Sequence, residues 1–270
     1  MPTSQAAKPR STFVFFTLAF GFTWALQVPG ALLAARGRLA PDSPLLGLAM
    51  LGILGPAVAA LGLTWRDEGR AGLRRLLTPL TRARVSVGWY ALALLVPGLG
   101  LTGILLLLEL AGREGAVSYV PHVGLVVSAC VISLGEELGW RGYAQPRLEA
   151  RYGVFGGAGI VGLLWGLWHI PMFVAAGVPL ALWLVLLLLF TGGSLFYSFI
   201  LRGSGSLLLV VLAHLGAHLN NPFAALPGDA LPLVVQSVVY GALGLALCWP
   251  QRAMKASTCS NGMWSEMAEP

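Results

Sequence analysis

Ionisable side chains occur at three places within otherwise apolar stretches of the sequence. These places are residues 133–149, 165–169 and 214–218. The side chains in these stretches that could form or support a catalytic site are Glu136, Glu137, Arg141, Trp165, His169, His214 and His218. A carboxylate can accept a proton from water, and a histidine can bind a divalent metal or donate a hydrogen bond to an oxyanion. Together these groups suit hydrolysis, by a route with a metal or by one without.

The spacing in the first two stretches predicts which groups share a helix face. Glu137 and Arg141 are i,i+4 neighbours, so they can form an ion pair that holds one carboxylate ionised. Glu136 is turned away by about 100° and is free to face a cavity. Trp165 and His169 have the same i,i+4 spacing, which predicts that the indole walls the pocket and restricts the imidazole.

The third stretch predicts a polar stripe along one helix. His214, His218 and Asn221 stand at i, i+4 and i+7, and therefore on one side of a helix. We expect His218 and Asn221 to support the site.

Composition places these groups in a membrane. The chain has 270 residues, of which 57% are hydrophobic and only 10% charged, as expected for a polytopic membrane protein. At membrane depth each charged side chain costs about 2.5–3.5 kcal/mol, so adjacent carboxylates there indicate a function. The three cysteines show no CxxC spacing, which gives no sign of a disulfide framework or a zinc knuckle.

The apolar runs predict an all-α fold of about eight transmembrane helices. We expect spans at 11–35, 44–65, 86–110, 122–144, 156–176, 180–201, 206–222 and 231–249. A polar N-terminal segment, 1–11, precedes a single membrane domain, 12–250, whose catalytic core is about 120–225. Residues 66–84 form a basic connector along the membrane surface, and we expect 251–270 to be a disordered tail.

Basic residues set the expected orientation. With both termini cytoplasmic, fourteen of the seventeen Lys and Arg residues lie inside, and only Arg36, Arg38 and Arg113 lie outside. This topology puts the three motifs at similar depths, roughly 10–20 Å below the cytoplasmic face.

Each signal also has a structural interpretation. His169 alone could be a hydrogen-bonding residue between helices, and Glu137 with Arg141 could be a structural ion pair. Tryptophans near predicted helix ends, such as Trp24 and Trp65, are most simply interfacial anchors. The combination at one depth favours a site.

The motifs resemble those of the CPBP family, the CAAX proteases and bacteriocin-processing enzymes, which includes the type II CAAX prenyl endopeptidases. The family pattern is EExxxR, then FxxxH, then HxxxN or HxxxD. Residues 136–141 match the first motif fully, 165–169 have Trp for Phe, and 214–218 have His for Asn or Asp.

The resemblance implies an intramembrane endopeptidase of a bacterial cell membrane, with its active site open to the cytoplasm. Its substrate would be a peptide or lipidated protein, its surroundings would be membrane lipids, and no nucleic acid would be involved. Glu136 would be the general base, supported by Glu137 and Arg141. His169 and His214 would ligate a metal, zinc first, together with Glu136, or would stabilise the oxyanion without a metal.

Two other functions stay open at this stage. A catalytically silent membrane scaffold or bacteriocin-immunity factor would fit the changed third motif. A proton-coupled transporter could use Glu136 and the histidines as a relay, but the sequence shows no inverted repeat to support it.

Overall fold

The computed structural model describes residues 9–112, 123–219 and 231–248, and every regular element in these ranges is helical. The α-helices are α1 (Pro9–Ala34), α2 (Pro44–Gly52), α3 (Gly55–Leu77), α4 (Val87–Leu110), α5 (Val123–Glu137), α6 (Gln145–Trp168), α7 (Ile170–Ala175), α8 (Trp183–Ser204), α9 (Leu207–Leu219) and α11 (Leu231–Cys248). Three short elements join them: η1 (Thr78–Thr81), η2 (Leu138–Ala144) and η3 (Leu180–Leu182). The predicted all-α membrane class is confirmed.

Several of these segments are long and apolar enough to cross a membrane. In the described ranges they are Ser11–Ala34, Val123–Ala175 and Leu180–Ser204. Pro44–Gly52 and Gly55–Thr81 would make a fourth if this pair, bent by 47°, is one span. The number of crossings and the side on which the termini lie stay predictions.

The predicted connector between the spans at 122–144 and 156–176 is helical. Helix α5 continues through η2, a π-helical segment, directly into α6. The chain reverses instead at Gly153, whose φ of 73° and ψ of 174° are open essentially to glycine alone. A Cβ on Gly157 would lie 2.5 Å from the backbone nitrogen of Glu149, so the two arms of this turn are in contact.

The second predicted span, 44–65, is divided. Helix α2 ends at Gly52, and α3 carries the chain onward with a second break at Gly69, where φ is 60° and ψ is −150°. The basic connector expected at 66–84 is therefore mostly the end of α3 and η1. Proline at the start of α3 and glycine within it account for these bends.

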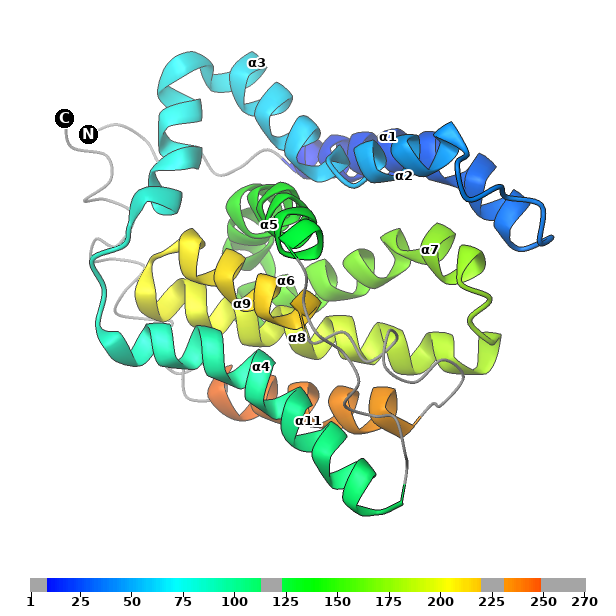
Figure 1. Cartoon of the computed structure of the whole chain (residues 1–270). Coiled ribbons are helices and arrows are strands. Elements are labelled where there is room, and N and C mark those ends of the chain that lie inside the picture. The colour runs from blue at the N-terminus through cyan, green and yellow to red at the C-terminus, as the bar shows by residue number, and fades with distance from the viewer. Residues whose placement is uncertain (1–8, 113–122, 220–230, 249–270) are drawn as a thin grey trace.

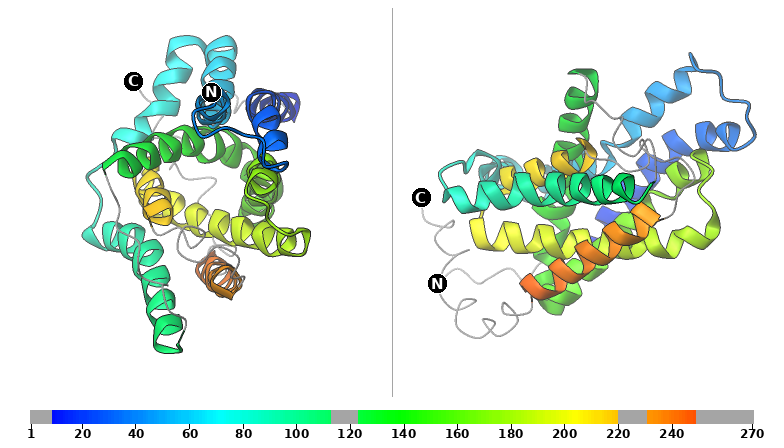
Figure 2. Two further views of the ribbon diagram at one scale, coloured as in Figure 1. Left: turned by 45° about the vertical axis from the view of Figure 1, so that its right-hand side comes forward. Right: turned by 60° about the horizontal axis from the view of Figure 1, so that its bottom comes forward.

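The helices that carry the motifs lie together in the middle of the molecule (Figure 1). Helix α5 packs against α3 and α9, and α8 packs against both α6 and α11. Helices α1 and α2 lie side by side on one flank, whereas α4 and α11 lie on the opposite side of the motif-bearing helices (Figure 2). Glycine permits the closest of these contacts, because a Cβ on Gly192 of α8 would lie 2.6 Å from the backbone nitrogen of Gly241.

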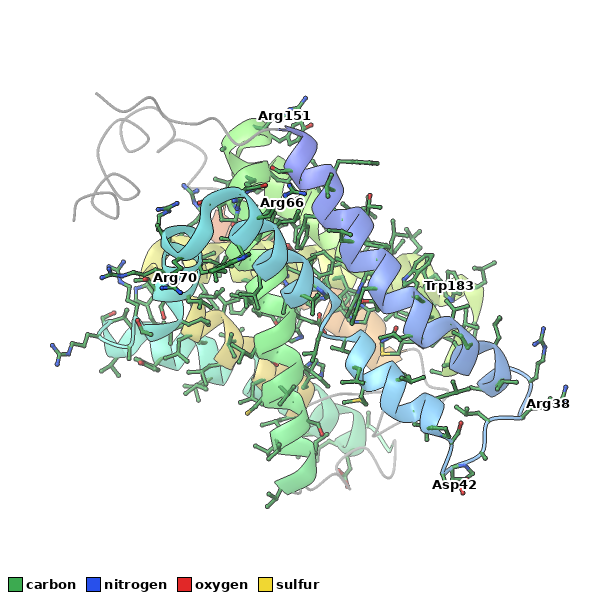
Figure 3. The ribbon with its side chains drawn as sticks, turned by 90° about the horizontal axis from the view of Figure 1, so that it is seen from above. Arg38, Asp42, Arg66, Arg70, Arg151 and Trp183 are labelled. Carbon is green, nitrogen blue, oxygen red and sulfur yellow. The ribbon has the colours of Figure 1, made fainter. Side chains whose placement is uncertain are left out.

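The labelled charges separate along the length of α1. Arg66, Arg70 and Arg151 lie towards one end of that helix, and Arg38 and Asp42 lie at the other end (Figure 3). The side of the membrane on which each group lies stays a prediction.

Candidate active site

Glu136 lies in the last turn of α5 and is 1% exposed. The indole Nε1–H of Trp165, on α6, donates a hydrogen bond of 2.5 Å to Glu136 Oε2. The Trp165 ring also lies edge-on to the His169 ring, as the i,i+4 spacing predicts, with 5.9 Å between ring centroids. The hydrogen bond to the carboxylate was not predicted. It fixes one oxygen of Glu136 and so orients the whole group.

Glu137 joins the first and third motifs. Its Oε1 accepts one hydrogen bond from Arg141 Nη1 at 2.9 Å and another from His214 Nδ1 at 2.7 Å. The predicted i,i+4 ion pair is thus present, and both of its side chains are fully buried. The Arg141 guanidinium also lies over the rings of Trp165 and Tyr197, at 4.2 and 4.9 Å from their centroids. Glu137 and Arg141 therefore act as a fixed unit between α5 and α9.

His169 stands at the break between α6 and α7. Its Nδ1 lies 2.8 Å from the backbone carbonyl oxygen of Trp165, which can only accept, so Nδ1 carries the proton and donates. The ring stacks on Phe190, with 4.3 Å between centroids and 25° between planes. In the neutral imidazole the Nε2 lone pair remains available.

His214 and His218 stack on successive turns of α9, with 4.6 Å between centroids and 18° between planes. Because Arg141 keeps Glu137 as an acceptor, His214 Nδ1 donates to it and the Nε2 lone pair of His214 is left available. His218 Nε2 is buried and has no hydrogen-bond partner among the residues that the structure describes. Asn221, predicted to extend this stripe, lies outside the described residues.

The candidate metal ligands differ from the predicted set. In the described part of the chain, the ligand atoms of Glu136, His214 and His218 lie within 4.8 Å of one another. His169, predicted as a ligand, is not in this group. Its ring is held against Phe190 at the helix break, whereas His218 is brought to His214 by the helix repeat itself. The structure thus groups His218 with Glu136 and His214, and the ligand role of His169 stays a prediction.

A cavity of about 470 Å³ opens onto these groups. Glu136, His169, His214 and His218 line its polar end. Much of the remainder is lined by apolar side chains of α1, α2 and α7, among them Ala31, Leu46, Ala49, Met50 and Met172, with Gln27 as a polar exception. The lining therefore combines these four ionisable side chains with a larger set of apolar ones from α1, α2 and α7, which we call the apolar arm.

Residues 119–220, which contain all three motifs, match the family model described as type II CAAX prenyl endopeptidase Rce1-like. This segment is therefore similar to that family, and we call it the Rce1-like segment. A curated protein named "CAAX prenyl protease 2", from Methanococcus maripaludis, is 37% identical to this chain over 89 residues. The alignment covers 29% of this chain and 32% of that protein, so the chain matches about a third of the length of its relative. The resemblance to CPBP proteases is confirmed.

The Rce1-like segment supplies the ionisable groups of the site, and helices outside it complete the cavity. Ala31, Ala49 and Met50 line the apolar arm from α1 and α2, which precede residue 119. Sequence reasoning did not single out these residues, nor Tyr197 and Phe190 of α8. Their only sequence signal was membership of an apolar helix, which does not distinguish a cavity wall from a lipid-facing surface.

Proposed function

We propose that the protein is an intramembrane endopeptidase that cleaves a prenylated or otherwise membrane-delivered peptide near its C-terminus. The observation that carries the proposal is the cavity, where an oriented carboxylate and three imidazoles meet an apolar arm. The Rce1-like segment supports the same reaction class.

Glu136 is the general base. It accepts a proton from a water in the cavity as that water attacks the scissile carbonyl, and then returns the proton to the amine that leaves. The Trp165 N–H keeps the carboxylate at one orientation through both transfers. His169 presents the Nε2 lone pair to the cavity, where it accepts a hydrogen bond from the water or from the peptide N–H.

A divalent metal, with zinc as the first candidate, would also fit between Glu136, His214 and His218. The Nδ1–H of His214 is held by Glu137, an outer-shell contact typical of metal-binding histidines, and the buried His218 Nε2 has no partner in the described ranges. When bound, zinc would polarise the scissile carbonyl and make water easier to deprotonate. The roles of Trp165, Glu137 and Arg141 are the same with or without the ion.

The apolar arm suits the lipid part of the substrate. Apart from Gln27, its lining side chains from α1, α2 and α7 are apolar and offer hydrocarbon contacts. A lipid chain in this arm would place the peptide that it carries beside Glu136. We further propose that the protein lies in a bacterial cell membrane with its site open to the cytoplasm. The distribution of basic residues predicts this orientation.

The test is cleavage of a quenched fluorescent farnesyl-peptide by purified protein in detergent. Wild type is compared with Glu136→Gln and with Glu109→Gln, which changes an exposed carboxylate on α4. We expect Glu136→Gln to lose activity by at least about a hundredfold, the range for a general base, and Glu109→Gln to retain it. Full activity of Glu136→Gln would overturn the proposal. Loss of wild-type activity on adding a zinc-selective chelator would select the metal-dependent version.

A further inference from the structure

Helix α1 donates a hydrogen bond to the backbone beside His169. The indole Nε1–H of Trp24 lies 3.0 Å from the carbonyl oxygen of Trp168, 144 residues away in sequence. Trp168 is the last residue of α6, and His169 follows it. Trp24 itself stands outside the Rce1-like segment of residues 119–220.

The backbone at this point is interrupted. His169 has φ −80° and ψ −1°, well away from α-helical values, and it separates α6 from α7. Pro171 has no N–H, so it cannot donate to the carbonyl of Leu167 as a residue four positions on would do in a regular helix. Shorter-range bonds hold part of this break, since the His169 N–H donates to the Gly166 carbonyl at 3.1 Å and the Phe173 N–H donates to the His169 carbonyl at 3.0 Å. The Trp24 indole adds a constraint on the Trp168 peptide group from outside this helix.

The aromatic contacts around this bond extend the same connection. The Trp168 ring lies edge-on to the His169 ring at 4.8 Å between centroids, and edge-on to the Trp140 ring at 5.7 Å. Phe16, also on α1, stacks on Trp140 at 5.9 Å. Helix α1 thus contacts Trp140, which precedes Arg141, and Trp168, which precedes His169.

We propose that Trp24 is a positioning residue, whose indole N–H fixes the Trp168 peptide group and so sets the orientation of the His169 imidazole in the cavity. The catalytic consequence rests on the proposed function, but the structural consequence does not. Without the indole N–H, the Trp168 peptide group can tilt, and the His169 ring shifts relative to Glu136 although its contacts with Trp165 and Phe190 persist.

The first test does not depend on activity. The chain has four histidines, so ¹⁵N-histidine spectra are simple, and single His→Asn variants assign each resonance. Trp24→Phe removes the donor, and replacement of Trp24 by benzothienylalanine removes it while keeping the ring shape. We expect the His169 ring resonances to shift in both proteins and those of His214 to stay in place. Unchanged His169 resonances in the benzothienylalanine protein would overturn the proposal.

The second test separates positioning from binding. Trp24→Phe and the benzothienylalanine protein should lower kcat on the order of tenfold, as the loss of one oriented hydrogen bond allows, with KM within twofold of wild type. Trp65→Phe, which changes a tryptophan that is 53% exposed on α3, should leave both constants unchanged. If wild type is active and the proteins without the indole N–H keep its full kcat, the proposed role of Trp24 is overturned, whereas the proposed function is not. Absence of cleavage by wild type would count against the proposed function, and the histidine spectra would then decide the role of Trp24.

Discussion

Glu137 is the carboxylate on which Arg141 and His214 both depend. Its Oε1 lies 2.9 Å from Arg141 Nη1 and 2.7 Å from His214 Nδ1, and the carboxylate and guanidinium are fully buried. A Glu137→Gln variant keeps the shape of the side chain and removes its charge. The Arg141 guanidinium would then be buried without this counter-charge, so the variant should be less stable.

The expected loss can be worked out from these contacts. Removing one partner of a buried ion pair costs about 3–5 kcal/mol. The guanidinium would keep its positions over the Trp165 and Tyr197 rings, and each such contact contributes about 0.5–2 kcal/mol. We therefore expect the low end of the range, a loss of about 3 kcal/mol in the free energy of unfolding. A double variant, Glu137→Gln with Arg141→Met, removes both charges and should recover most of this loss.

The assay is reversible unfolding in mixed micelles of increasing SDS content, followed by tryptophan fluorescence. Glu68→Gln is the control, because the Glu68 side chain is 34% exposed and its ion pairs with Arg75 and Arg147 should each contribute no more than about 1 kcal/mol. The stable double variant should remain inactive towards peptide, because the His214 Nδ1–H has lost the carboxylate that orients it. This reasoning would be refuted if Glu137→Gln lost no more unfolding free energy than the control. It would also be refuted if the double variant were no more stable than Glu137→Gln.

Three further predictions concern the fold, the metal and the substrate. Gly153→Ala should lower stability by about 1–3 kcal/mol because only glycine tolerates its backbone angles, whereas Gly159→Ala, whose added Cβ meets no atom within 4 Å, should be at least as stable as wild type because alanine favours the helix. His218→Ala should weaken zinc binding in calorimetric titrations by at least about tenfold; equal affinity would exclude His218 as a ligand. Ala49→Phe should fill part of the apolar arm and raise KM for a farnesyl-peptide without lowering kcat; an unchanged KM would place the lipid elsewhere.

Helical periodicity was sufficient to predict much of the site. The ion pair between Glu137 and Arg141 and the common face of His214 and His218 follow from i,i+4 spacing, and both are present. The meeting of α5, α6 and α9 followed from the cost of burying polar groups in a membrane, because such groups must find one another.

The remaining features depend on geometry that spacing does not determine. The Trp165 hydrogen bond to Glu136 depends on side-chain rotamers and on how α5 approaches α6. Glycine is compatible with either a helix or a turn, so the reversal at Gly153 could not be distinguished from an ordinary helix position. The bond from Trp24 joins residues too distant in sequence for any local pattern to predict it, and an interfacial role was the simplest interpretation of that tryptophan.

The most direct test of the account is a single turnover in H₂¹⁸O, with the products analysed by mass spectrometry. Excess wild-type protein and a defined farnesyl-peptide should give one cleavage, with one ¹⁸O atom in the new carboxylate, because the account requires attack by a cavity water that Glu136 deprotonates. Glu136→Gln should give almost no product over the same time, and Glu109→Gln should match wild type. Equal product from Glu136→Gln, or product without ¹⁸O, would contradict the account.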